Sequence, residues 1–193
     1  MAFRSMAESI YFNKKQRTWV RESLEVAESL AADYFRVDLT DLDQFSYDLM
    51  TLAHLRGMEK TERALAQVCK YEYAIKKPVV KGKEFYRICL QDNRILRAAQ
   101  SDFAVSLKPL LHYVVMHELI HVIRFSIDPG KFHCDSRQKR VEEKEVHRIT
   151  HNCLQAFGDP KVIDLLERYR PLWDERADFM WAPLTSRAGV PNF

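Results

Sequence analysis

Two histidines and a glutamate lie close together in an apolar stretch of the chain. The stretch Leu110–Ile123 contains His117, Glu118 and His121 in the order His-Glu-x-x-His. On a helix, residues four positions apart share one face, so the two imidazoles are one turn apart. Two histidines at this spacing can ligate one zinc ion, and the glutamate beside them can take a proton from a water that zinc activates. The pattern therefore predicts a hydrolytic zinc site.

The residues around the motif favour the same interpretation. Those flanking His117 and His121 are bulky and uncharged, which is typical of a buried helix that gives a metal ion a dry and stiff support. The alternative is a core helix in which the two histidines bind no metal. Because the chain has only seven histidines, a chance occurrence of the motif in this setting is the less favoured interpretation.

This stretch resembles the active-site helix of the zincin metallopeptidases. The resemblance covers about twenty residues directly, and it implies three protein ligands to zinc with Glu118 as general base. In the metzincin branch a glycine and a histidine follow the second motif histidine by three and six positions. Arg124 and Ile127 occupy those positions here, which excludes that branch.

The gluzincin branch instead takes a glutamate from a second helix further along the chain. Residues 140–154 fit this requirement because their apolar residues recur at helical spacing. We expect Glu143 to be the third ligand, since it follows His121 by twenty-two positions and leaves room for a turn and a returning helix. The acidic spacing of Glu143 and Glu145 also resembles the second helix of the ImmA/IrrE-type peptidases. A charged first helical turn is the simpler explanation of any single glutamate there.

Three further histidines remain open as ligands or supporting residues. His147 and His151 recur with Glu143 every four residues, so all three share one stripe of the helix. In gluzincins the residue four positions after the ligand supports a motif histidine, but it is usually aspartate or asparagine, so His147 is also a rival ligand. His133 lies twelve positions after His121, in the region from which SprT-like proteases take a histidine. An exposed loop histidine is the simpler interpretation of His133.

The chain as a whole is expected to be mostly helical and of the α+β class. The resemblance implies a zincin-like core with a small antiparallel sheet over the motif helix. Periodicity and turn residues predict the following elements: helices over 14–36, 40–57, 59–70, 106–128, 140–158 and 159–171, and strands over 71–75, 85–90 and 94–96. We expect one domain, in which residues 1–70 form a helical region packed on a core of residues 71–170. Residues 171–193 form a C-terminal tail that either covers the core or lies in the substrate cleft.

Composition limits the classes of partner. The chain has 193 residues, of which 47% are hydrophobic and 30% charged, and a net charge of +3. So weak a charge predicts neither a nucleic-acid surface nor a membrane surface. The four cysteines show no paired spacing, and the first residues do not resemble a secretory signal. Both features predict free thiols in a cytoplasmic protein.

The leading hypothesis is a cytoplasmic zinc metallopeptidase that acts on a peptide or protein substrate. Zn²⁺ is expected at His117, His121 and Glu143, with Glu118 as base. The alternative is a zinc-binding regulatory or partner-binding module that keeps the scaffold without turnover. Composition and spacing leave the substrate, the residue that stabilises the oxyanion and the oligomeric state open.

Overall fold

The computed structural model describes residues 10–38, 45–72, 84–101 and 105–175, with the backbone alone for residue 72 and residues 169–175. Its elements are, in chain order, α1 (Lys14–Phe35), β1 (Tyr47–Thr51), η1 (Leu52–His54), η2 (Gly57–Glu59), β2 (Ala66–Glu72), β3 (Glu84–Leu90), α3 (Asp92–Ser101), α4 (Leu107–Ile127), η3 (Pro129–His133), α5 (Ser136–Phe157) and α6 (Pro160–Glu175). Helices predominate and the three strands form one sheet. The predicted α+β class is therefore confirmed.

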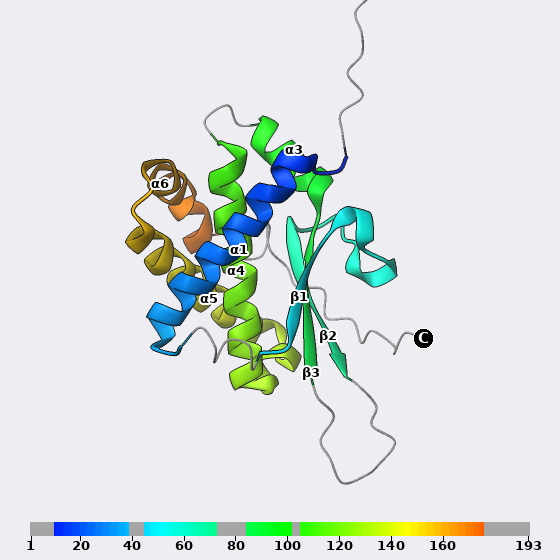
Figure 1. Cartoon of the computed structure of the whole chain (residues 1–193). Helices are drawn as coiled ribbons and strands as arrows, with labels where there is room; N and C mark the ends of the chain where they lie inside the picture. Colours follow the sequence, from blue (N-terminus) through cyan, green and yellow to red (C-terminus); the bar gives the residue numbers. More distant parts are fainter. Residues whose placement is uncertain (1–9, 39–44, 73–83, 102–104, 176–193) are drawn as a thin grey trace, which may run out of the picture.

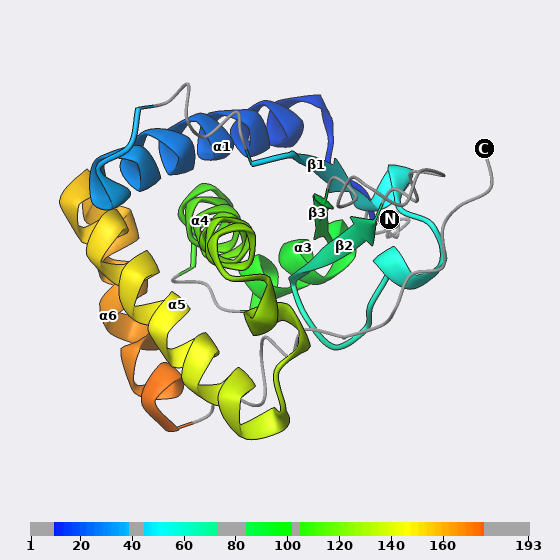
Figure 2. The ribbon, with the colours of Figure 1, turned by 90° about the horizontal axis from the view of Figure 1, so that it is seen from below.

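Helix α4, which carries the motif, lies at the centre of the molecule. Helix α1 runs along one side of it, α5 along a second side, and the sheet lies on a third (Figure 1 and Figure 2). Every residue from Pro109 to Ile123 is buried, as expected of a helix that is apolar on all faces. In the described part of the chain, α4 is the one helix long and apolar enough to cross a membrane. Because 83% of its apolar window is buried inside the molecule, it fits a core helix.

Helix α1 packs against α4 through small side chains. Its buried residues include Val20, Ser23, Ala27 and Ala31, which recur every three or four positions and so share one face. Asn13 caps the helix by accepting a hydrogen bond from the backbone N–H of Gln16, and the Gln16 side chain accepts one in return. The predicted helix over 14–36 is confirmed.

The sheet is mixed, so the prediction of an antiparallel sheet is wrong. Its strand order is β1-β3-β2, with β1 parallel and β2 antiparallel to β3. Strands β1 and β2 form the two edges of the sheet, and β3, which comes last in the chain, lies between them. Because the chain crosses from one edge to the other after β1, β3 runs parallel to β1. The Tyr86 hydroxyl of β3 donates to the Phe125 carbonyl of α4 at 3.2 Å, which joins the sheet to the motif helix.

Three predicted elements in the first half of the chain are wrong. The helix predicted over 40–57 contains strand β1, and the helix predicted over 59–70 contains most of β2. The strand predicted over 94–96 lies inside α3. Asp92, expected in a tight turn, is the first residue of α3, and its carboxylate accepts hydrogen bonds from the backbone N–H groups of Phe12 and Leu52, both at 2.9 Å. The described residues before position 70 therefore combine helix α1 with strand β1 and most of β2, and the expected boundary after residue 70 lies within β2.

The second half follows the predictions more closely. The helices predicted over 106–128 and 140–158 are confirmed as α4 and α5, although α5 begins earlier, at Ser136. Gly158 ends α5 with a positive φ of 73°, a conformation that glycine adopts without steric cost. The last helix continues past Pro171 to Glu175, so the predicted stop at Pro171 is wrong. Residues 176–193, most of the expected tail, lie outside the described residues.

Candidate metal centre

The fold brings the two motif histidines to the inner face of α4, opposite α5. His117 and His121 are 0% and 4% exposed, and their ring centroids are 4.9 Å apart. Neighbouring elements cover α4 on several sides (Figure 2). Both imidazoles are buried. Nδ1 of His121 is buried and makes no hydrogen bond within the described residues.

Helix α5 places Glu143 against both histidines. The Oε1 atom of Glu143 lies 3.2 Å from Nε2 of His121, and its Oε2 atom lies 3.5 Å from Nε2 of His117. The carboxylate is 4% exposed. One carboxylate oxygen thus faces each imidazole.

Burial and mutual contact shift the pKa values of these groups in opposite directions. Burial lowers the pKa of His117 below its ordinary value. Burial acts in the same way on His121, but the negative charge of Glu143 outweighs it and raises the pKa of His121. Burial opposes ionisation of Glu143, yet the contacts with His121 and His117 hold its pKa well below the usual range. Glu143 is therefore a carboxylate at neutral pH and His117 a neutral imidazole, the protonation states that metal ligands need.

Glu118 lies beside this group on α4. It is 4% exposed, and burial raises its pKa to about 7. A carboxyl group with a pKa near neutrality can both accept and release a proton at physiological pH, as general acid–base catalysis requires. Glu118 thus has the properties of a base next to the two histidines.

His147 joins the same cluster from α5, one turn after Glu143. Its ring centroid lies 4.6 Å from that of His117, and its Nδ1 atom lies 2.6 Å from the hydroxyl of Tyr113. Within the described residues, the ligand atoms of His117, Glu143 and His147 all lie within 4.8 Å of one another. His121 is connected to this group through its contact with Glu143. The structure therefore groups His117, Glu143 and His147 as candidate donors, with His121 in contact with Glu143.

The other candidate residues lie away from the cluster. His133 is exposed in η3, where its ring contacts Phe132. His151 is half-buried on α5, one turn beyond His147. Glu145, two positions after Glu143, forms an ion pair with Arg148 at 2.6 Å and not with the motif histidines. Of the residues singled out in the sequence, Glu143 and His147 are the ones that α5 brings to the motif.

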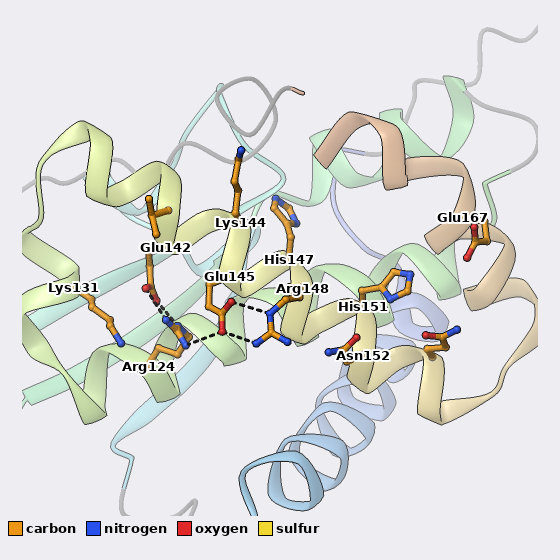
Figure 3. Close-up of a pocket in the computed structure, with 12 residues that line it drawn as sticks. Arg124, Lys131, Glu142, Lys144, Glu145, His147, Arg148, His151, Asn152 and Glu167 are labelled. Atoms are coloured by element: carbon orange, nitrogen blue, oxygen red, sulfur yellow. Dashed lines mark hydrogen bonds and ion pairs between the residues drawn. The ribbon is translucent and has the colours of Figure 1, made fainter. Parts of the chain in front are cut away.

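An ion pair between α4 and α5 was not predicted from the sequence. The guanidinium of Arg124, one turn after His121, binds the carboxylate of Glu142 through Nε and Nη2, and Glu142 directly precedes Glu143. Figure 3 shows Arg124 between Glu142 and Glu145, with Arg148 against Glu145. A two-point contact of this kind fixes geometry as well as charge. It holds α5 in the register that presents Glu143 to the histidines.

These residues also border a cavity of about 1050 Å³ over α5 (Figure 3). Its lining includes Arg124, Glu142, Lys144 and His147. His117, Glu118, His121 and Glu143 do not line this cavity. His147 is thus the member of the donor cluster that borders it.

The donor cluster has the ligand chemistry of a metal site. Zinc bonds to histidine nitrogen and carboxylate oxygen are about 2.0–2.2 Å long, so neighbouring ligand atoms of a tetrahedral site are roughly 3.3–3.6 Å apart. The contacts of Glu143 with His121 and His117, at 3.2 and 3.5 Å, are close to this spacing and longer than an ordinary charged hydrogen bond. The Oε2 atom of Glu143 is buried and accepts no hydrogen bond within the described residues, as expected of an atom placed for an ion.

Comparisons with protein-family models, with curated proteins and with solved structures gave no match. The functional interpretation therefore depends on the residues and their geometry.

Proposed function

We propose that this protein is a zinc-dependent metallopeptidase of the zincin type. In this proposal His117, His121 and Glu143 hold the ion, and Glu118 is the general base. The observation that carries it is the position of the buried Glu143 carboxylate, with one oxygen at 3.2 Å and the other at 3.5 Å from the two motif histidines. Choosing a peptide bond as the substrate rests on the resemblance of the motif helix to the zincins.

Each residue has a role that follows from its surroundings. A bound zinc ion would polarise the scissile carbonyl and make a water nucleophilic at neutral pH. Glu118 takes the proton of the attacking water, because its pKa of about 7 leaves it able to accept one, and it can then deliver that proton to the leaving amine. His117 and His121 keep the ion beside Glu118, since all three are carried on one buried helix.

One observation favours a second function, that of a zinc-binding module without turnover. His147 groups with His117 and Glu143, and His121 contacts Glu143, so the proposed ion has a candidate fourth protein ligand. A zinc ion held by four protein ligands has no open position. Structural zinc sites are closed in this way, whereas catalytic sites keep a position for water. Cleavage of peptides therefore separates the two functions.

Replacing Glu118 by glutamine tests the proposed reaction. The amide keeps the size of the side chain but cannot accept the proton, so Glu118→Gln is expected to keep its zinc and to lose about 10²–10⁴-fold in cleavage rate. The assay is cleavage of an unbiased peptide library by the zinc-loaded full chain, with and without a chelator. Glu62→Gln, at a side chain that is 84% exposed, is the matched control. Cleavage by Glu118→Gln at the wild-type rate would contradict the mechanism, and zinc binding without cleavage by the wild type would favour the module.

A further inference from the structure

His147 has the position and surroundings of a metal ligand. Its ligand atom lies within 4.8 Å of those of His117 and Glu143. It is 3% exposed, and its ring centroid lies 4.6 Å from that of His117.

Tyr113 supplies the second feature that ligating histidines share. A histidine that binds a metal through one ring nitrogen usually donates its other ring N–H to a fixed acceptor, which sets the tautomer and the orientation of the ring. The Tyr113 hydroxyl lies 2.6 Å from Nδ1 of His147, and the two rings are stacked with 20° between their planes. If Nδ1–H donates to the Tyr113 oxygen, Nε2 of His147 carries the lone pair.

We propose that His147 is a fourth ligand to the ion held by His117, His121 and Glu143, and that Tyr113 positions it. This inference rests on the proposed metal centre and specifies its resting state. With four protein donors the ion has no open position, so the centre is closed until His147 leaves it.

The position of His147 explains why it would be the donor that leaves. It lines the cavity over α5, whereas His117, His121 and Glu143 do not (Figure 3). A peptide entering through this cavity meets His147 before the other three donors. A carbonyl oxygen of that peptide, or a water, would take the position that His147 vacates, so one ligand would replace another and no covalent bond would break.

Zinc affinity tests the ligand assignment without any substrate. Competition with a chromophoric chelator is expected to show zinc bound at least about tenfold more weakly by His147→Ala than by the wild type. Tyr113→Phe keeps the stacked ring but loses the acceptor, so a smaller weakening is expected. His151→Ala removes a histidine one turn further along α5 and is expected to leave the affinity within about twofold of the wild type. Equal affinities for His147→Ala and His151→Ala would overturn the assignment.

An open-position probe tests the closed resting state. Acetohydroxamate, added to the cobalt-loaded full chain and followed by the visible absorption of cobalt, can bind only where a coordination position is free. We expect His147→Ala to bind it at least about tenfold more tightly than the wild type, because the fourth position is then open. Equal binding by the two proteins would show that the wild-type centre is already open. If circular dichroism shows that His147→Ala is unfolded, His147→Gln replaces it in both assays.

The failure of this inference can be told apart from failure of the proposed function. Normal zinc affinity in His147→Ala, together with cleavage that depends on Glu118, overturns only the role of His147. Weakened zinc binding by His147→Ala, together with full activity of Glu118→Gln, overturns only the proposed reaction with Glu118 as base. A wild-type protein that binds no zinc overturns both.

Discussion

Glu143 is the residue on which the proposed centre depends most. It is a buried carboxylate that faces two imidazoles, and its charge raises the pKa of His121. A buried charge needs a counter-charge, and a proton on His121 can supply it. Zinc would take over this role and displace the proton, since ligating histidines must be neutral.

At the level of single residues, the sequence was informative where spacing along one helix sets the geometry. His117, His121 and His147 were singled out because residues four apart share a helix face. Glu143 was chosen for its distance from His121 along the chain and for the resemblance to the gluzincins. The Arg124–Glu142 ion pair was not predicted, because its partners lie on different helices. Whether two such side chains meet depends on how the helices are rotated against each other, which periodicity does not specify.

Glu59 provides a prediction that is independent of the metal. This 6%-exposed carboxylate accepts hydrogen bonds from Tyr71, from Arg87 and from the backbone N–H of Arg56. Burial opposes its ionisation, but these donors outweigh burial and lower its pKa. Glu59→Gln is therefore expected to lower the free energy of unfolding by about 1–3 kcal/mol at pH 7, as measured by urea denaturation.

The sign of the pKa shift also sets the pH dependence. A carboxyl group with a lowered pKa in the folded state contributes stability above its unfolded pKa, which is about 4.3 for glutamate, and loses that contribution as the pH falls. The stability difference between wild type and Glu59→Gln should therefore stay nearly constant above about pH 5 and narrow as the pH falls from about 5 to about 3. Glu62→Gln, at an exposed site, should stay within about 0.5 kcal/mol of the wild type. A difference for Glu59→Gln that stays constant from about pH 5 to about pH 3 would contradict the assigned role.

At the level of elements, the long helices were predictable and two of the three strands were not. Helices α1, α4 and α5 each run over five turns or more, and α1 and α5 begin at a capping residue, so local signals agree with the fold. Strand β1 lies in a segment whose apolar residues recur at helical spacing, yet it pairs with β3, which lies far along the chain. Pairing with a distant strand outweighs local propensity for such short segments.

The ion pair between α4 and α5 predicts an effect on the metal from residues that do not ligate it. Glu142→Gln weakens the contact with Arg124 and loosens the register that presents Glu143. Zinc affinity is expected to fall by about tenfold, as is typical when a partner that orients a ligand is lost. Competition with a chromophoric chelator measures the zinc affinity of each variant. Glu145→Gln is the control, because the Glu145 carboxylate is 4.0 Å from Arg124 and more exposed. Equal affinities for the two variants would contradict the positioning role.

At the level of the whole molecule, α4 is covered by elements from both halves of the chain. Helix α1 packs on α4 through its small buried residues, and β1 pairs with β3 in the sheet that lies beside α4. The described residues before position 70 therefore help to complete the core that surrounds the motif. The sequence suggested that this region packs on the core, but its two strands depend on long-range pairing and were missed.

Because α1 packs closely on α4, replacing a small buried residue of α1 by a larger one is expected to destabilise the fold. Ala27 is 1% exposed on the face of α1 that packs against α4. Ala27→Leu is expected to lower the free energy of unfolding by about 1–3 kcal/mol, because the added methyl groups have no space. Ser29→Leu introduces the same side chain at an exposed position of α1 and should change stability by less than about 0.5 kcal/mol. Urea denaturation of both variants measures these changes. If Ala27→Leu were as stable as Ser29→Leu, the face of α1 that contains Ala27 would be loosely covered.

The measurement that tests the central claim most directly is zinc content by elemental mass spectrometry. The wild type, Glu143→Gln and His133→Ala would each be purified, supplied with zinc and freed of excess metal. The proposed centre predicts about one zinc per chain in the wild type and in His133→Ala, whose histidine is exposed in η3. It predicts a large loss in Glu143→Gln, because a neutral amide replaces the carboxylate between His117 and His121. Zinc retained in full by Glu143→Gln, or none bound by the wild type, would contradict the account.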